Sequence, residues 1–217
     1  YERAHDWVKT PHIDALAESG MRFRTCYTGA SCQMSRSMML TGRLQHGIKS
    51  FNVSNYPSCE YDPKVQPFWP ANFRKQGYKT ACIGKWHLGA DVGHGRDWDY
   101  SVLWDRMGKK NGSAYYYKTL VRHNGGARVP LGGYSTDRYT ELAVDYILNK
   151  SKANDKPWFL WLCYGGVHGP FTEADRHKDM YADAPATTVP ADIFGPRPTK
   201  PRHLVDYTSW KKDKDGE

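Results

Sequence analysis

Helical and strand-like patterns of apolar residues alternate along much of the chain. Helical spacing covers residues 10–20, 35–40, 68–76 and 136–149, and short strand-like runs cover residues 21–27, 78–83 and 158–164. The last run is unbroken, which is typical of a strand buried on both faces. This alternation predicts an α/β fold whose mainly parallel sheet is flanked by helices.

Local signals set the limits of some elements and mark the irregular parts of the chain. Thr10 can cap the first helix, and Pro11 suits its first turn. Residues 90–133 are polar and rich in glycine and aromatic side chains, so we expect little regular structure there. Residues 173–217 are rich in proline and charge, and we expect them to form a surface segment of the same domain as residues 1–172.

Composition narrows the class of protein. The chain has 217 residues, of which 39% are hydrophobic and 25% are charged, as is ordinary for a folded domain. Its apolar runs are all too short to cross a bilayer as a helix. The chain begins without Met and ends in a charged run, so we expect a fragment that lacks both ends of a longer protein.

Net charge and cysteine usage indicate which ligands to expect. The net charge of +8 most often means a solvated surface with a basic bias, and the alternative is attraction to an anionic ligand. Lys and Arg are scattered along the chain, which argues against a nucleic-acid partner and fits an acidic glycan or a small anion at least as well. The 5 cysteines include no CxxC pair of a zinc site. Cys82 and Cys163 lie within apolar runs, where we expect buried free thiols.

Polar residues follow each of the three predicted strands. They are Cys32 and Arg36 after the first strand, Lys85 and His87 after the second, and His168 after the third. Ligands of parallel α/β sheets bind beyond the carboxyl ends of the strands. We therefore expect these five residues to lie at one edge of the sheet.

These residue types suit chemistry on an anionic substrate. A helix N-terminus favours the thiolate of Cys32, and Arg36 adds positive charge one turn later. Lys85 supplies a fixed charge for an oxyanion, and His87 and His168 can donate or accept a proton near neutral pH. Taken singly, each residue fits a structural or surface role at least as well, so their order along the chain carries more weight than any one of them.

Four segments resemble the motifs of the sulfatase family in the family's own order. Residues 32–43 (CQMSRSMMLTGR) resemble the first sulfatase signature, and residues 77–89 (GYKTACIGKWHLG) are similar to the second nearly throughout. Residues 10–17 (TPHIDALA) resemble the helix that precedes the first signature. Residues 156–160 (KPWFL) and 168–171 (HGPF) resemble a later strand and its His-x-Pro loop.

The resemblance implies a partial catalytic domain of the alkaline-phosphatase-like superfamily that hydrolyses a sulfate ester of a sulfated glycan or of an aryl or alkyl alcohol. In sulfatases a maturation enzyme oxidises the signature Cys to Cα-formylglycine, so Cys32 would become the nucleophile. Arg36 would hold the hydrated aldehyde, and Lys85 and His87 would bind it and the sulfate. His168 would protonate the departing alcohol or contact the sulfate.

The resemblance also implies a calcium ion (Ca2+), with Cys32 as one ligand in its formylglycine form, and a periplasmic or secreted location. The family's other metal ligands are not identifiable in this sequence, so we expect them outside the chain and expect the fragment alone to be inactive. Met34 stands where the signature has Pro or Ala, a position that the maturation enzyme reads. Two alternatives stay open: a phosphate or phosphonate ester hydrolase of the same superfamily, and a non-catalytic homologue that binds acidic glycans.

Aromatic residues in the irregular part of the chain have two interpretations. They can stack on sugar or aryl rings of a substrate, or they can pack a small core. The residues concerned are Trp98, Trp104, Tyr115, Tyr116 and Tyr117.

Overall fold

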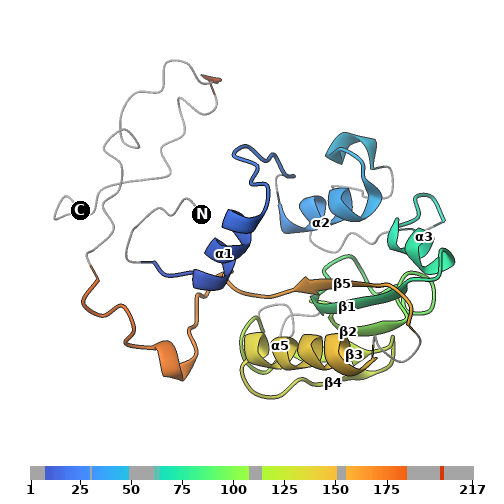
Figure 1. Cartoon of the computed structure of the whole chain (residues 1–217). Coiled ribbons are helices and arrows are strands. Elements are labelled where there is room, and N and C mark those ends of the chain that lie inside the picture. Colours follow the sequence, from blue (N-terminus) through green and yellow to red (C-terminus); the bar gives the residue numbers. More distant parts are fainter. Residues whose placement is uncertain are drawn as a thin grey trace. The chain divides into compact units, whose positions relative to one another are not determined.

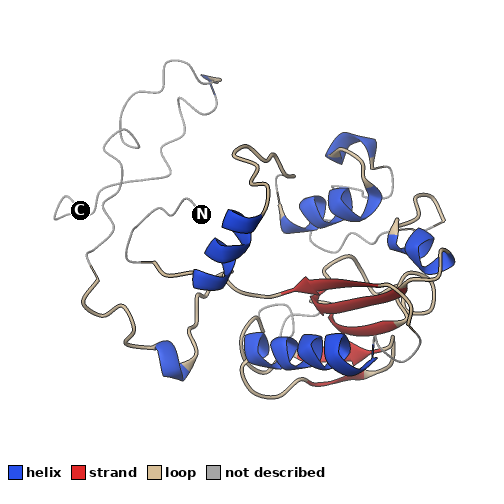
Figure 2. Cartoon of the chain, in the orientation of Figure 1, coloured by secondary structure: helices blue, strands red, loops and turns tan. Residues whose placement is uncertain are grey.

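The computed structural model describes residues 8–29, 31–48, 62, 64–107, 114–150, 155–184 and 201–202. Its α-helices are α1 (Pro11–Ser19), α2 (Cys32–Thr41), α3 (Pro70–Lys75) and α5 (Ser135–Asp145). Its strands are β1 (Lys79–Lys85), β2 (Tyr100–Trp104), β3 (Leu120–His123), β4 (Arg128–Pro130) and β5 (Trp158–Cys163). Single turns of other helix types occur at η1 (Gln45–Gly47), η3 (Tyr146–Lys150) and η5 (Asp175–His177). Figures 1 and 2 show these elements.

The chain forms two compact units. One unit is Ser19–Asp175 and contains the sheet. The other is Tyr1–Glu18 together with Arg176–Glu217, and its described part contains most of α1 and all but the first residue of η5. Most of the surface segment predicted for residues 173–217 lies outside the described residues. No helix in the described part of the chain is both long and apolar enough to span a membrane.

The sheet has five strands in the order β4-β3-β2-β1-β5. Strand β1 pairs in parallel with β2 and with β5, whereas β2, β3 and β4 pair antiparallel. The predicted α/β fold is confirmed, and the sheet is mixed, with a parallel part made of β5, β1 and β2. The carboxyl ends of these three strands therefore lie at the same edge of the sheet.

The sheet is covered on both faces because successive residues of a strand point to opposite sides. Ala81 and Ile83 of β1 belong to an apolar cluster that includes Tyr139 and Ala143 of α5. Cys82 belongs to the opposite cluster, which includes Met34 and Leu40 of α2 and Phe68 just before α3. Figure 1 shows α5 on one side of the sheet and α2 and α3 on the other. Helix α2 therefore packs against the sheet and also faces the ends of its strands.

Three expectations about strands were wrong. Residues 21–27 form no strand, because no described strand offers them a hydrogen-bonding partner. Their large apolar side chains are exposed. Residues 90–133 contain β2, β3 and β4 instead of being irregular. Residues 158–164 were expected to be buried on both faces, but β5 lies at an edge of the described sheet and Trp158 is 43% exposed.

The predicted helices are confirmed with small shifts at their ends. Helix α2 begins at Cys32 and ends at Thr41, and the left-handed backbone of Gly42 caps it with a hydrogen bond from its N–H to the Met38 carbonyl. Trp98, Trp104, Tyr115 and Tyr116 are buried, so these aromatic side chains form part of the core and do not offer an open surface for sugar rings.

Candidate active site

Cys32 lies at the start of α2 rather than in a turn that follows a strand. Ser31 precedes it with an extended backbone, so the thiol is at the end of the helix where amide N–H groups are unpaired. The Cys32 Sγ atom is 3.3 Å from Nδ1 of His87. The partial positive charge of the helix N-terminus favours a negatively charged group at this position.

Lys85 and His87 reach Cys32 from the end of β1. Both side chains are buried, with exposures of 6% and 5%. Strand β1 extends two residues beyond the run predicted at residues 78–83, so Lys85 is its last residue. His87 then adopts a left-handed backbone with φ of 56°. The second signature therefore places a lysine and a histidine beside the thiol.

Arg36 holds the main chain of this loop from one turn further along α2. Its Nε donates to the Trp86 carbonyl oxygen at 2.7 Å, and its Nη2 donates to the Lys85 carbonyl oxygen. Its guanidinium lies 4.4 Å from the ring centroid of Trp161 on β5. Arg36 thus ties α2 to the ends of β1 and β5, which fixes the position of Cys32 relative to Lys85.

Arg106 completes the cluster, and the sequence analysis missed it. Its Nη1 lies 3.8 Å from Cys32 Sγ and 3.1 and 3.2 Å from the two ring nitrogens of His87. Trp104 at the end of β2 is the register partner of Lys85, so Arg106 follows its strand by two residues, as His87 follows β1. The signal was the apolar run of β2 followed by a charged pair, inside a region expected to lack strands.

His168 approaches through Tyr115. The two rings are stacked with centroids 4.0 Å apart, and the Tyr115 hydroxyl is 3.0 Å from Nε2 of His168. Nδ1 of His168 is 2.9 Å from the Gly169 carbonyl oxygen, so Nδ1 carries a proton. The ring of Tyr115 also lies 5.2 Å from Lys85 Nζ and 5.2 Å from the Arg106 guanidinium. Tyr115 therefore links His168 to the cluster around Cys32.

The charges in this cluster are positive and they shift one another's protonation. Burial, together with the charges of Arg106, Lys85, Arg36 and His168, lowers the pKa of His87 to about 3. Burial and the two arginines also lower the pKa of Lys85, although Cys32 acts in the opposite direction. An anion bound here would relieve this repulsion, and His87 without one is neutral at pH 7.

The described residues do not by themselves fit a calcium ion. Calcium prefers carboxylate and carbonyl oxygens, whereas the side chains around Cys32 are Arg36, Lys85, His87 and Arg106. No group of three His, Cys, Asp or Glu side chains in the described part of the chain could hold a metal ion.

The thiols expected to be buried and free are so. Cys82 and Cys163 are buried and unbridged, and Cys26 is exposed. Cys59 lies outside the described residues. Among the described cysteines near the strand ends, Cys32 is the one whose thiol is partly accessible.

The chain is similar to curated sulfatases. The N-acetylglucosamine-6-O-sulfatase of Bacteroides thetaiotaomicron is 28% identical over 188 residues, which cover 86% of this chain and 31% of that protein. Arylsulfatase J of Mus musculus is 28% identical over 195 residues, which cover 80% of this chain and 31% of that protein. The chain therefore spans about a third of the length of these relatives.

Solved structures match the fold of the chain. The structure of BT4656 in complex with its substrate D-glucosamine-2-N,6-O-disulfate matches with a TM-score of 0.72 and 26% identity, over 87% of this chain and 35% of that one. Ps i-CgsB in complex with κ-ι-κ-neocarrahexaose matches with a TM-score of 0.68 and 25% identity, over 81% of this chain and 44% of that one. A family model described as Sulfatase matches residues 3–203, and the chain belongs to the sulfatase family.

Proposed function

We propose that the full-length protein hydrolyses a sulfate ester and that its nucleophile is formylglycine made from Cys32. The observation that carries the proposal is the approach of Cys32 Sγ to His87 Nδ1 at 3.3 Å, beside the cations Lys85 and Arg106. A sulfated glycan is the substrate class we favour over an aryl or alkyl sulfate. The relatives named for amino-sugar sulfatases and the structure that holds a disulfated glucosamine support this choice.

The described side chains suit the charges and protons of this reaction. Hydrolysis concentrates negative charge on the sulfate oxygens and on the departing alcohol oxygen. Lys85 and Arg106 stabilise that charge from fixed positions in a water-poor site. Neutral His87 accepts a proton, and His168, once protonated on both nitrogens, donates one from Nε2 to the alcohol. Formylglycine supplies the attacking oxygen when it is formed.

The first test is whether Cys32 is converted. A peptide spanning residues 28–43, taken from the full-length protein in its natural host, loses roughly 18 Da when the thiol becomes the aldehyde. Met34→Pro restores the family's motif, so we expect this variant to be converted at least as completely as the wild type. Cys32→Ala is the matched control that cannot be converted.

The second test is turnover. We expect the converted protein to hydrolyse sulfate esters in preference to phosphate esters, and Cys32→Ala to be inactive. A fully unmodified thiol together with no turnover in the wild type would refute the proposal. Retained binding of a sulfated glycan in that case would favour the non-catalytic homologue, and a preference for phosphate or phosphonate would favour the related hydrolase.

A further inference from the structure

A basic cavity lies at the opposite edge of the sheet from Cys32. It has a volume of about 300 Å³ and is lined by residues of α3, by residues 77–79 at the start of β1, and by Arg96, Asp99 and Lys156. Lys79 begins β1 and Lys85 ends it, so the two edges are about 20 Å apart along this strand. The cavity is therefore separate from the cluster around Cys32.

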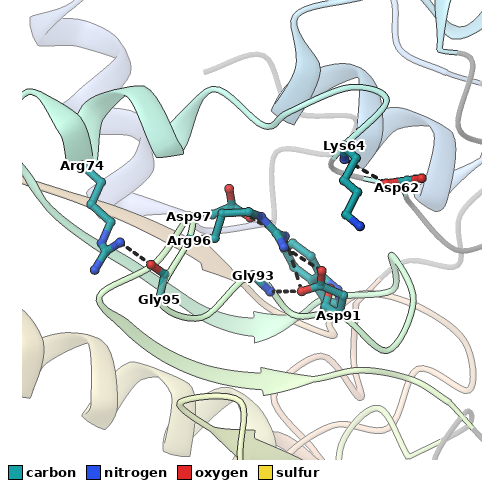
Figure 3. A network of polar contacts seen from close by, with 9 residues as sticks. Asp62, Lys64, Arg74, Asp91, Gly93, Gly95, Arg96 and Asp97 are labelled. Carbon is teal, nitrogen blue, oxygen red and sulfur yellow. Dashed lines mark hydrogen bonds and ion pairs between the residues drawn. The ribbon is translucent and has the colours of Figure 1, made fainter.

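The arginines of this cavity are already held by carboxylates. Arg74 Nε donates to Asp99 at 2.6 Å, and Asp99 also accepts hydrogen bonds from the backbone N–H and the hydroxyl of Thr80. Arg96 lies between Asp91 and Asp97, as Figure 3 shows, with distances of 2.7 and 2.8 Å. These ion pairs restrain the two arginines and neutralise their charge. Neither arginine is therefore the main group that attracts a ligand.

Three lysines supply the uncompensated charge. Lys75, Lys79 and Lys156 line the cavity, and none of them has an ion pair with any residue that the structure describes. The single carboxylate in the lining, that of Asp99, is satisfied by Arg74 and Thr80. Clefts lined by one sign of charge concentrate ligands of the other sign.

An aromatic ring and an open glycine in the lining of the cavity suit a sugar that carries the anion. Tyr78 lines it, with a ring packed against Phe73 at 4.8 Å between centroids. The backbone of Gly77 faces open space, since a Cβ there would meet no atom within 4 Å. An aromatic ring beside mobile ammonium groups offers a face for a pyranose and donors for its sulfate groups.

We propose that this cavity is a second binding site for sulfated glycan, remote from the catalytic cluster, which retains the polymer on the enzyme. The choice of a sulfated glycan as the anion rests on the proposed function. The site itself holds no nucleophile and performs no chemistry. It raises the concentration of polymeric substrate near the protein and leaves small sulfate esters unaffected.

The test uses the full-length protein and fluorescein-labelled dextran sulfate, with fluorescence anisotropy at 0.1 M salt. We expect the double variant Lys75→Glu/Lys156→Glu to bind about tenfold more weakly. The matched control Lys9→Glu/Lys178→Glu changes the net charge equally at exposed positions outside the cavity, and we expect its dissociation constant to stay within about twofold. Lys75→Gln/Lys156→Gln repeats the test with a smaller charge change should the first variant fold poorly.

Three outcomes overturn the proposal. They are unchanged binding in both cavity variants, an equal loss in the control, and tighter binding of a labelled oligothymidylate than of dextran sulfate. The initial rate on a small aryl sulfate is expected to be unchanged in the cavity variants. Because anisotropy needs no turnover, the binding result stands even if the protein proves to have no sulfatase activity, so the two proposals fail separately.

Discussion

Asp105→Asn removes the charge that holds the far end of β2 next to Arg106. The Asp105 side chain is fully buried, and its Oδ2 accepts from Arg122 Nε at 2.9 Å and from Arg128 Nε at 2.8 Å. Its Oδ1 accepts from the Met107 N–H at 3.1 Å. Breaking a buried ion pair costs about 3 to 5 kcal/mol. The arginines retain exposures of 25% and 32%, so screening by water lowers our expectation to about 2 to 3 kcal/mol.

The stability difference between wild type and Asp105→Asn should depend on pH in a definite direction. Burial alone would raise the pKa of Asp105, but hydrogen bonds from Arg122, Met107 and Arg128 outweigh burial and lower it. A lowered pKa in the folded protein means that the stabilisation is complete above the unfolded value of about 4 and is lost as pH falls through the folded pKa. The difference in stability between wild type and Asp105→Asn should therefore shrink as the pH is lowered below about 4.

Urea denaturation followed by tryptophan fluorescence measures both effects. Asp91→Asn is the matched control, because the Asp91 side chain is 50% exposed and its pairing with Arg96 is worth less than about 1 kcal/mol. Equal losses of unfolding free energy in Asp105→Asn and Asp91→Asn at pH 7 would refute the reasoning. A difference between wild type and Asp105→Asn that persists unchanged to pH 3 would refute the electrostatic explanation.

Three further changes test the sheet and the site. Gly84→Ala places a Cβ against the main chain of β5 at a φ of 105°, so we expect a loss of about 3 kcal/mol in thermal or urea unfolding, against about 1 kcal/mol for Gly77→Ala, whose Cβ meets open space. Tyr115→Phe keeps the ring stacked on His168 but removes its hydroxyl contact, so kcat on a sulfate ester should fall about tenfold while KM stays within about twofold; an unchanged kcat would contradict the positioning role. Arg106→Gln should lower kcat/KM about 100-fold without altering the melting temperature by more than a few degrees, and an unchanged kcat/KM would exclude Arg106 from the charge cluster.

Local signals in the sequence were sufficient to predict most helices and to single out Cys32, Lys85 and His87, which the fold brings together. The apolar periodicity of α2 and α5 predicted both helices before any packing was known, although α2 begins at Cys32 rather than at residue 35 and α5 ends at Asp145 rather than at residue 149. Cys32 belongs to the first motif, which begins at the start of α2. Lys85 and His87 belong to the second motif, which includes the end of β1. Lys85 and His87 lie at the carboxyl end of a parallel strand, as expected, whereas Cys32 reaches them from the start of α2, which follows no strand.

Strands depended more on tertiary structure because their hydrogen bonds are made to other strands. β2 was missed and residues 21–27 were wrongly assigned as a strand, since pairing partners and not the apolar pattern decided both cases. A strand that is apolar throughout, such as β5, can still lie at an edge of the described sheet.

The sequence by itself determined the family motifs, the approximate positions of the helices and the identity of the thiol at the start of α2. Only the tertiary structure decided that Arg106 and Tyr115 join the site, because each is brought there by the register of β2 with β1 and by stacking on His168. The low pKa of His87 likewise arises only from the folded state, in which burial and neighbouring cations combine. Motifs are carried by adjacent residues, whereas electrostatic fields are produced by residues that folding brings together.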